Sequence, residues 1–145
     1  MRQWALYRKN QIKLSKGEVL ISFIYENEGR ICREDRRESE MKVPDELPQG
    51  CLGWWRSVAR AKPPTQKELC ERLERLLEGL PAATSTHKEV LLWLICLYLT
   101  RKRILRQNGA AFTHVKTGVV YQTQPDAIEP TLIEAAMTEL MEAIS

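Results

Sequence analysis

An uninterrupted run of ten apolar residues, Val90–Leu99, constrains the fold of this chain more than any other feature. It follows Thr86-His-Lys-Glu89, the pattern of a helix-capping box, and it ends at Thr100 and three consecutive cations. A membrane-spanning helix needs about 20 apolar residues, whereas about ten to fourteen are typical of a helix in a protein core. The run therefore predicts a helix that is buried on nearly all sides and that other elements must cover.

The first residues and the cysteines indicate the compartment of such a chain. Met1–Asn10 contains charges but no apolar segment of the kind that forms the centre of a secretory signal peptide. Cys70 and Cys96 lie among leucines in helical stretches, where small buried thiols are common, and the chain does not have the pattern of a disulfide framework. We therefore expect a cytoplasmic protein with reduced cysteines and no membrane association, and export by a route that does not read a signal peptide is the alternative.

The length of the chain suits one domain. A chain of 145 residues can bury about 70% of its unfolded surface without help from disulfides. Ala61-Lys-Pro-Pro64 interrupts regular structure between two stretches of different pattern. We predict a single domain over residues 1–145, with a β-rich part at 1–60 and a helical part that contains a β-hairpin at 65–145.

The first forty residues are typical of β-structure. Val19–Tyr25 is rich in β-branched and aromatic residues and lies between turn-forming residues, so it predicts a strand. Arg30–Arg33 is expected to return beside it as the second strand of a hairpin. Shorter candidate strands are Trp4–Tyr7 and Ile12–Leu14, residues 38–50 predict a polar loop, and Leu52–Val58 is either another strand or an irregular packing segment.

Two helices are predicted after the proline pair. Thr65-Gln-Lys-Glu68 is a capping box that opens a helix with leucines at helical spacing, and Gly79-Leu-Pro81 ends it. The helix of the apolar run follows, and its basic end agrees with the helix dipole, which favours cations there. Asn108-Gly109 is expected to end this second helix.

A hairpin and a third helix complete the predicted fold. The hairpin consists of Ala111–Val115 and Val119–Thr123, and an amphipathic helix starts at about Pro130. The fold class is therefore α+β, with an N-terminal antiparallel β-ribbon, a central helical hairpin, a short β-hairpin and a C-terminal amphipathic helix. The apolar face of the last helix carries Ile133, Met137, Leu140 and Ile144.

Residues that catalysis usually needs are sparse. The chain has two histidines, His87 and His114, and no Gly-x-Ser-x-Gly turn, phosphate-binding Gly-x-x-x-x-Gly-Lys loop or Gly-x-Gly-x-x-Gly motif. Glu34 and Asp35 are adjacent on a predicted strand, so their side chains are expected on opposite faces and in solvent. The cysteines are 19, 19 and 26 residues apart, which does not fit the close pairs of a zinc site. We predict no catalytic residue, no metal site, no cofactor and no enzymatic activity.

Two short stretches nevertheless resemble the knuckles of a zinc ribbon. The first is similar to Cys-x-x-Cys-Gly-x-x-Leu-x-x-Gly-Glu, with Tyr7 and Asn10 at the positions of the ligand cysteines. The second is similar to Arg-x-Asp-x-Cys-x-x-Cys, with Arg37 and Glu40 in place of thiolates. The chain thus resembles an uncharacterised family of small bacterial proteins with a zinc-ribbon-like N-terminus. This resemblance implies a degenerate ribbon without its metal, and an ordinary hairpin with knuckle-like turns is the alternative. Two further stretches carry the resemblance, Gly53–Ser57 and Leu97–Leu105.

The charge distribution allows an anionic partner. Residues 1–107 have a net charge of +7 and residues 108–145 one of −4, which indicates either attraction of an anion or two solvated faces. Binding of nucleic acid is therefore one functional hypothesis, although glutamates alternate with the arginines and the isoelectric point of about 8.7 is below the value of about 9 that is typical of nucleic-acid-binding domains. The candidate anion-binding residues are Arg33, Arg37, Arg101, Lys102, Arg103 and Arg106.

Two adjacent tryptophans give the leading functional hypothesis. Trp54 and Trp55 follow a proline-rich loop, and on an extended segment their rings point to opposite sides, so both cannot enter one core. Together with Arg56 and Arg60 they have the composition of an interface anchor. The alternative is that both rings cover the helix pair. We predict a non-enzymatic, cytosolic protein-interaction or adaptor module whose partner is another protein, and the oligomeric state stays open.

Overall fold

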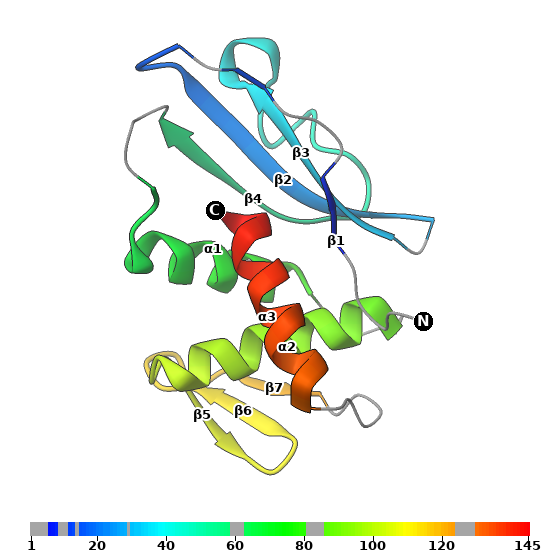
Figure 1. The fold of residues 1–145 in the computed structure, drawn as a ribbon, viewed down its shortest axis with the longest axis vertical. Helices are drawn as coiled ribbons and strands as arrows, with labels where there is room; N and C mark the ends of the chain where they lie inside the picture. The colour runs from blue at the N-terminus through cyan, green and yellow to red at the C-terminus, as the bar shows by residue number, and fades with distance from the viewer. Residues whose placement is uncertain are drawn as a thin grey trace.

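The computed structural model describes residues 6–8, 12–13, 15–28, 30–58, 63–80, 86–123 and 130–145, without the side chains of 6–8, 86, 87 and 130. These residues confirm the α+β class, since a β-sheet, a layer of helices and a second, smaller sheet follow one another down the molecule (Figure 1). The elements are β1 (Leu6–Arg8), β2 (Val19–Asn27), β3 (Arg30–Arg37), a 3-10 turn (Glu38–Glu40), β4 (Cys51–Val58), α1 (Gln66–Gly79), α2 (Thr86–Arg101), β5 (Leu105–Asn108), β6 (Ala111–His114), β7 (Val120–Gln122) and α3 (Pro130–Ile144).

The N-terminal sheet has the strand order β1-β3-β2-β4. The predicted hairpin is confirmed as β2 and β3, and it is longer than expected because β3 continues to Arg37. Leu52–Val58 is a strand and not an irregular segment, because β4 pairs antiparallel with β2. The short β1 runs parallel to β3, while Ile12 and Lys13 are in no strand and Trp4 lies outside the described residues.

Both faces of this sheet are buried, which explains why six of the first seven residues of β2 are apolar. Ile24 and Ile31 face the helices and belong to the main core, whereas Phe23 and Tyr25 belong to a separate apolar cluster on the opposite face. The strand pairing shifts by one residue between Ile24 and Tyr25, so that β4 carries a bulge at Leu52. We call the face away from the helices the outer face.

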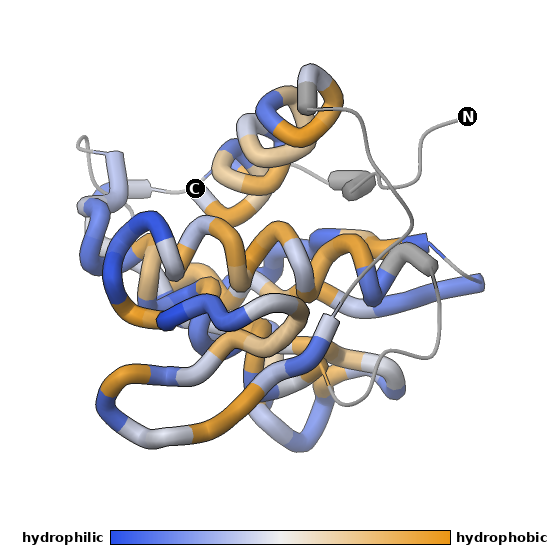
Figure 2. The backbone as a smooth tube through the Cα atoms, turned by 90° about the horizontal axis from the view of Figure 1, so that it is seen from below, coloured by the Kyte–Doolittle hydropathy of each residue, from blue (hydrophilic) through white to orange (hydrophobic). Residues whose placement is uncertain are grey.

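Helix α2 is the centre of the main core, as the apolar run predicts. All residues of Val90–Leu99 are buried except Trp93 and Leu97, which are partly buried and packed against the same core. Figure 2 shows the hydrophobic colour along most of this helix. Among the described residues, no helix combines the length and the apolar character that crossing a membrane requires. The helix begins at Thr86, whose side chain lies outside the described residues, so its cap stays a prediction.

The C-terminal end of α2 differs from the prediction. The helix ends at Arg101, and residues 105–108, expected as helix, form the strand β5. The reason is a Schellman turn, in which Ile104 N donates to Leu99 O at 2.9 Å, Arg103 N donates to Thr100 O at 3.0 Å and Arg103 takes a φ of 62°. An arginine therefore occupies the left-handed position that glycine usually fills, so no residue typical of a helix end marks this position in the sequence.

The second sheet and α3 cover α2 from other sides. The predicted hairpin is confirmed as β6 and β7, and β5 pairs with β6 to make three strands. The predicted C-terminal helix is confirmed as α3, which buries Met137, Leu140 and Ile144 in the main core. The predicted N-cap of α1 is also confirmed, since Glu68 N donates to Thr65 Oγ1 at 3.2 Å, and Thr65 Oγ1 donates to Glu68 Oε1 at 3.3 Å.

Candidate functional site

The two tryptophans of β4 lie on opposite faces of the sheet. Trp55 is 3% exposed and faces the helices, whereas Trp54 is partly exposed on the outer face opposite Phe23 of β2. Neither of the two simple alternatives therefore holds for both rings, because one ring is core and the other is at the surface. Of their predicted companions, Arg56 lies beside Trp54 and Arg60 lies outside the described residues.

Buried polar groups on the inner face hold the end of α3. Arg33 is 2% exposed, and its guanidinium donates to Asp35 Oδ1 at 3.0 Å, to Ser145 O at 2.9 Å and to Ala143 O. Arg72 of α1 donates to Ile144 O. The last carbonyls of a helix have no partner inside the helix, so the two arginines satisfy groups that would otherwise be unpaired. Arg33 thus has a structural role in the interior and is not part of a surface for anions.

The structure places Glu34 and Asp35 differently from the prediction that both side chains lie in solvent. Their side chains do point to opposite faces, but both residues are buried, at 8% and 1% exposure, and are not solvated. The prediction was wrong because β3 is an interior strand of a sheet that is covered on both sides. Asp35 pairs with Arg33 towards the helices, and Glu34 pairs with Arg36 at 2.8 Å on the outer face.

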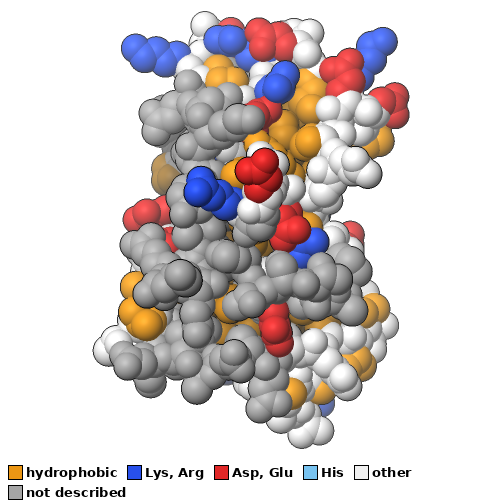
Figure 3. All heavy atoms as spheres, turned by 90° about the vertical axis from the view of Figure 1, so that its right-hand side faces the viewer, with side chains coloured by type: hydrophobic (Ala, Val, Ile, Leu, Met, Phe, Trp, Pro, Cys, Tyr) orange, Lys and Arg blue, Asp and Glu red, His pale blue; other side chains and the backbone are white. Residues whose placement is uncertain are grey.

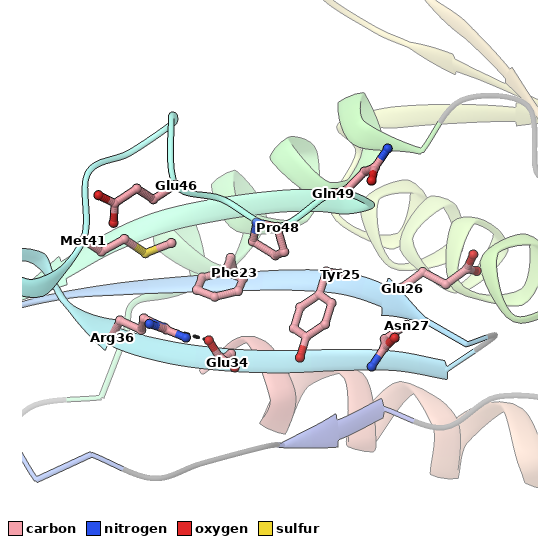
Figure 4. Close-up of a pocket in the computed structure, with 10 residues that line it drawn as sticks. All are labelled: Phe23, Tyr25, Glu26, Asn27, Glu34, Arg36, Met41, Glu46, Pro48 and Gln49. Carbon is pink, nitrogen blue, oxygen red and sulfur yellow. Dashed lines mark hydrogen bonds and ion pairs between the residues drawn. The ribbon is translucent and has the colours of Figure 1, made fainter.

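The outer face is hollowed into a cavity of about 350 Å³ between β2, β3 and residues 41–50 (Figure 4). Phe23 and Tyr25 form its aromatic floor, with ring centroids 5.7 Å apart. Met41 is buried beside them, although residues 38–50 are predicted as a polar loop. The other lining residues are Glu26, Asn27, Glu34, Arg36, Glu46, Pro48 and Gln49.

Charge at this cavity is largely balanced. The hydrogen bond and the negative charge of Glu34 raise the pKa of the Arg36 guanidinium, and the two side chains form an ion pair at 2.8 Å. Glu26 pairs with Lys88 of α2 at 3.4 Å, and Glu46 is exposed on the loop. The cavity therefore offers an apolar floor with a rim of mixed charge.

Trp54 extends this face towards the edge of the sheet. The guanidinium carbons of Arg56 and Arg75 lie 5.1 Å and 5.9 Å from its ring centroid. Arg75 of α1 also donates to Trp54 O at 3.1 Å, so it reaches the outer edge of β4. Arg56 forms an ion pair with Glu38 at 2.6 Å.

The predicted anion-binding residues do not come together. Arg37 pairs with Glu18 at 3.1 Å and with Glu40 at 3.4 Å, and Arg101 pairs with Glu134 at 2.8 Å. Lys102 and Arg103 lie together at the end of α2, whereas Arg106 is on β5. On the face drawn in Figure 3, acidic and basic side chains are interspersed.

The described residues hold no group of three or more His, Cys, Asp and Glu side chains that is able to bind a metal ion. Arg37, at one presumed ligand position of the resembled ribbon, instead donates to Lys13 O at 3.0 Å and pairs with Glu40, the other position of that knuckle. Asn10 and the side chain of Tyr7 lie outside the described residues.

None of the four cysteines, all within the described residues, forms a disulfide. Burial raises the pKa of the thiols of Cys51, Cys70 and Cys96, to about 12 for Cys96. A thiol is nucleophilic only as the thiolate, so burial lowers the reactivity of these three side chains near neutral pH.

His114 is held in a way that leaves no ring nitrogen for a reaction. Its Nε2 lies 2.7 Å from Glu74 Oε1, and its Nδ1 accepts from the backbone N–H groups of Lys116 and Thr117 at 3.2 Å. A general base needs a free nitrogen that faces a substrate, so this histidine has the geometry of a structural link between α1 and the second sheet. The side chain of His87 lies outside the described residues.

Comparisons of the chain with models of protein families, with curated proteins and with solved structures give no match.

Sequence reasoning missed the aromatic floor of the outer cavity. A signal for it was present, because Ile21, Phe23 and Tyr25 alternate with Leu20 and Ile24, so that β2 is apolar on both faces and needs cover on both. Met41 carried no such signal, since it is an isolated apolar residue among polar ones.

Proposed function

We propose that this chain is a non-enzymatic module that binds a partner protein through the outer face of its N-terminal sheet. The observation that supports this most directly is the cavity of about 350 Å³ with Phe23 and Tyr25 as its floor. A surface hollow with a floor formed by a second apolar cluster, apart from the main core, and with a polar rim is typical of a site that receives a side chain of a partner.

Trp54 supports the same surface. It stands opposite Phe23 in the pairing of β4 and β2, so it continues the aromatic floor beyond the cavity. Tryptophan and arginine are enriched among residues that dominate binding energies, and Trp54 is flanked by Arg56 and Arg75.

The mixed charge of the rim favours a protein over nucleic acid as the partner. Glu26, Glu34 and Glu46 surround the cavity together with Arg36, and Arg56 is paired with Glu38. A phosphate backbone needs several unpaired cations along one surface. Nucleic-acid binding, the alternative hypothesis, has less support because Arg33 is buried and because Arg37 and Arg101 have acidic partners.

The test compares proteins captured from the producing cell by the tagged wild type and by three variants, with mass spectrometry as the readout. Trp54→Ala removes the anchor and Glu46→Arg reverses a charge at the exposed rim, while Leu132→Ala truncates an exposed apolar residue on α3 as a matched control. Circular dichroism first establishes that each variant is folded.

We expect a specific partner to be retained by the wild type and Leu132→Ala and lost by Trp54→Ala. With the purified partner, Trp54→Ala is expected to weaken binding by about tenfold or more, because interface anchors contribute about 2 kcal/mol or more. A partner that binds all variants equally contradicts the proposal. Binding of single- or double-stranded DNA or RNA that falls steeply between about 50 and 200 mM salt supports the nucleic-acid hypothesis instead.

A further inference from the structure

A second cavity, of about 410 Å³, lies between the start of α1, the end of α2 and the turn after β6. In Figure 1, the start of α1 and the end of α2 are on the same side of the molecule. Cys70, Ile104 and Val115 supply apolar wall to this cavity. Its volume is within the range of about 300–1,000 Å³ that is typical of small-molecule sites.

Four cations from three segments line this second cavity, namely Lys67 of α1, Lys102 and Arg103 after α2, and Lys116 after β6. None of them forms an ion pair with any residue in the described ranges, and the ammonium of Lys102 lies 5.5 Å from the centroid of the Tyr98 ring. Of the two acids in the lining, Glu74 is engaged by His114. The cavity thus has an excess of unpaired positive charge, in contrast to the balanced outer face.

The backbone of Arg103 gives an independent indication. Its φ of 62° is in the left-handed region, which costs a non-glycine residue roughly 1–2 kcal/mol. Glycine is the residue that helices normally have at this position of a Schellman turn. The chain therefore carries an arginine at a site where the fold itself favours glycine, and its side chain lies at the rim of the cavity.

His114 fixes the opposite wall. Because Nδ1 accepts from the N–H groups of Lys116 and Thr117, the turn that carries the Lys116 side chain is tied to the ring. The ring is in turn held by Glu74 of α1 at 2.7 Å. Hydrogen bonds therefore hold the backbone that carries Lys116, so this part of the cationic rim is preorganised for a ligand.

We propose that this cavity binds a small organic anion with an apolar body, of the chemical class of a medium-chain carboxylate. The apolar part would contact Cys70, Ile104 and Val115, and the carboxylate would lie among Lys102, Arg103 and Lys116. The site shares no lining residue with the outer cavity, so the two binding functions are independent.

The test uses octanoate as the probe and 1-octanol as the uncharged control, with binding followed by NMR titration of the backbone amides. The informative variant is Arg103→Gly, because it relieves the left-handed strain and removes the charge at once. Arg106→Gln is the matched control, since it removes a neighbouring exposed cation that does not line the cavity. The double variant Lys102→Gln/Lys116→Gln removes two rim charges without touching the turn of Arg103.

We expect octanoate to shift the amides around residues 67–74, 102–104 and 114–116. Arg103→Gly should raise the thermal midpoint and weaken octanoate binding by about three- to fivefold, and the double variant should weaken it by about tenfold or more. Arg106→Gln and Trp54→Ala should bind like the wild type, so failure here is separate from failure of the proposed partner site.

Equal binding of octanoate and 1-octanol would overturn the proposal, because the cations would then contribute nothing. So would unchanged affinity in Arg103→Gly, or the absence of any amide shift in this region at millimolar octanoate.

Discussion

Gly79 packs so closely on Leu52 that a Cβ atom at residue 79 would lie 1.5 Å from the Leu52 carbonyl oxygen. This contact places the last turn of α1 on the bulge of β4. One residue further along β4, a Cβ at Gly53 would lie 2.9 Å from a methyl carbon of Leu76. The helix and the strand that carries both tryptophans therefore meet at two points where a glycine allows a close approach, to the backbone of Leu52 at Gly79 and to Leu76 at Gly53.

Gly79→Ala should destabilise the protein, although alanine is by itself the better helix former by about 0.5–1 kcal/mol. The added methyl cannot fit against a main-chain carbonyl, so α1 must shift, and overpacking of this kind costs about 1–3 kcal/mol or more. Urea unfolding followed by circular dichroism measures the change. The control is Glu78→Ala at the exposed neighbour, which should change stability by less than about 0.5 kcal/mol. A stabilised Gly79→Ala protein would contradict the close packing.

The local features of the fold were predictable and the long-range ones were not. Thr65 and Glu68 are three residues apart, so the cap that they form depends only on nearby residues and is observed as predicted. The guanidinium of Arg33 donates to the carbonyl groups of residues 143 and 145. These partners are more than a hundred residues away in the sequence, so the residues around Arg33 do not predict them. The predicted end of the second helix was wrong because a helix end is expected at a glycine, whereas Arg103 takes the left-handed position here. Ile104, the next residue, packs against the main core.

The same distinction applies to the candidate site. Alternation along β4 correctly separates the faces of Trp54 and Trp55, because it depends only on strand geometry. Which face is core depends on where α1 packs, and its close contacts with β4 at Gly53 and Gly79 join residues far apart in the sequence.

Arg33→Met should cost about 3–5 kcal/mol in unfolding free energy. Removal of the guanidinium takes away the ion pair that it forms with the carboxylate of Asp35, which is 1% exposed, and removes the donor to carbonyl groups at the end of α3. Adding Asp35→Asn should recover part of the loss, because the buried negative charge that Arg33 stabilised is then gone. A double-mutant cycle measures this coupling. Purely additive effects of the two substitutions would contradict the role of the pair.

Cys96 should lower the stability of the protein in alkaline solution. Burial raises the pKa of its thiol from 9.0 to about 12, so above pH 9 the unfolded chain loses this proton while the folded chain keeps it. The stabilisation is complete below pH 9 and is lost as the pH rises towards 12. Between pH 8 and 10.5 the wild type should lose about 2 kcal/mol more than Cys96→Ala.

Urea titrations of both proteins at the two pH values give this difference, in which the cost of the cavity left by Cys96→Ala cancels. Parallel slopes for the two proteins would show that the thiol titrates alike in both states. In native protein at pH 8, Cys96 should also resist alkylation by iodoacetamide until denaturant is added, because the buried thiol is both protonated and inaccessible.

Trp55→Ala and Trp54→Ala should differ in their effect on stability, although the residues are neighbours. Trp55 is fully packed in the main core beside Arg33 and Arg72, whose guanidinium carbons lie 5.3 Å and 5.2 Å from its ring centroid, so its removal should cost about 3–5 kcal/mol. Trp54 is partly exposed, so only part of its surface leaves water on folding. Trp54→Ala should therefore lower the free energy of unfolding by about 1–2 kcal/mol.

Trp55→Phe separates ring packing from hydrogen bonding at this position. The Nε1 of Trp55 has no hydrogen-bond partner among the described residues, so replacing the ring breaks no hydrogen bond there. Trp55→Phe should therefore lower the free energy of unfolding less than Trp55→Ala does, in proportion to the side-chain volume that is removed. Chemical denaturation of the three variants, monitored by far-ultraviolet circular dichroism, measures these differences. If Trp54→Ala were as destabilised as Trp55→Ala, Trp54 would be a core residue, and its loss would say nothing about partner binding at the outer face.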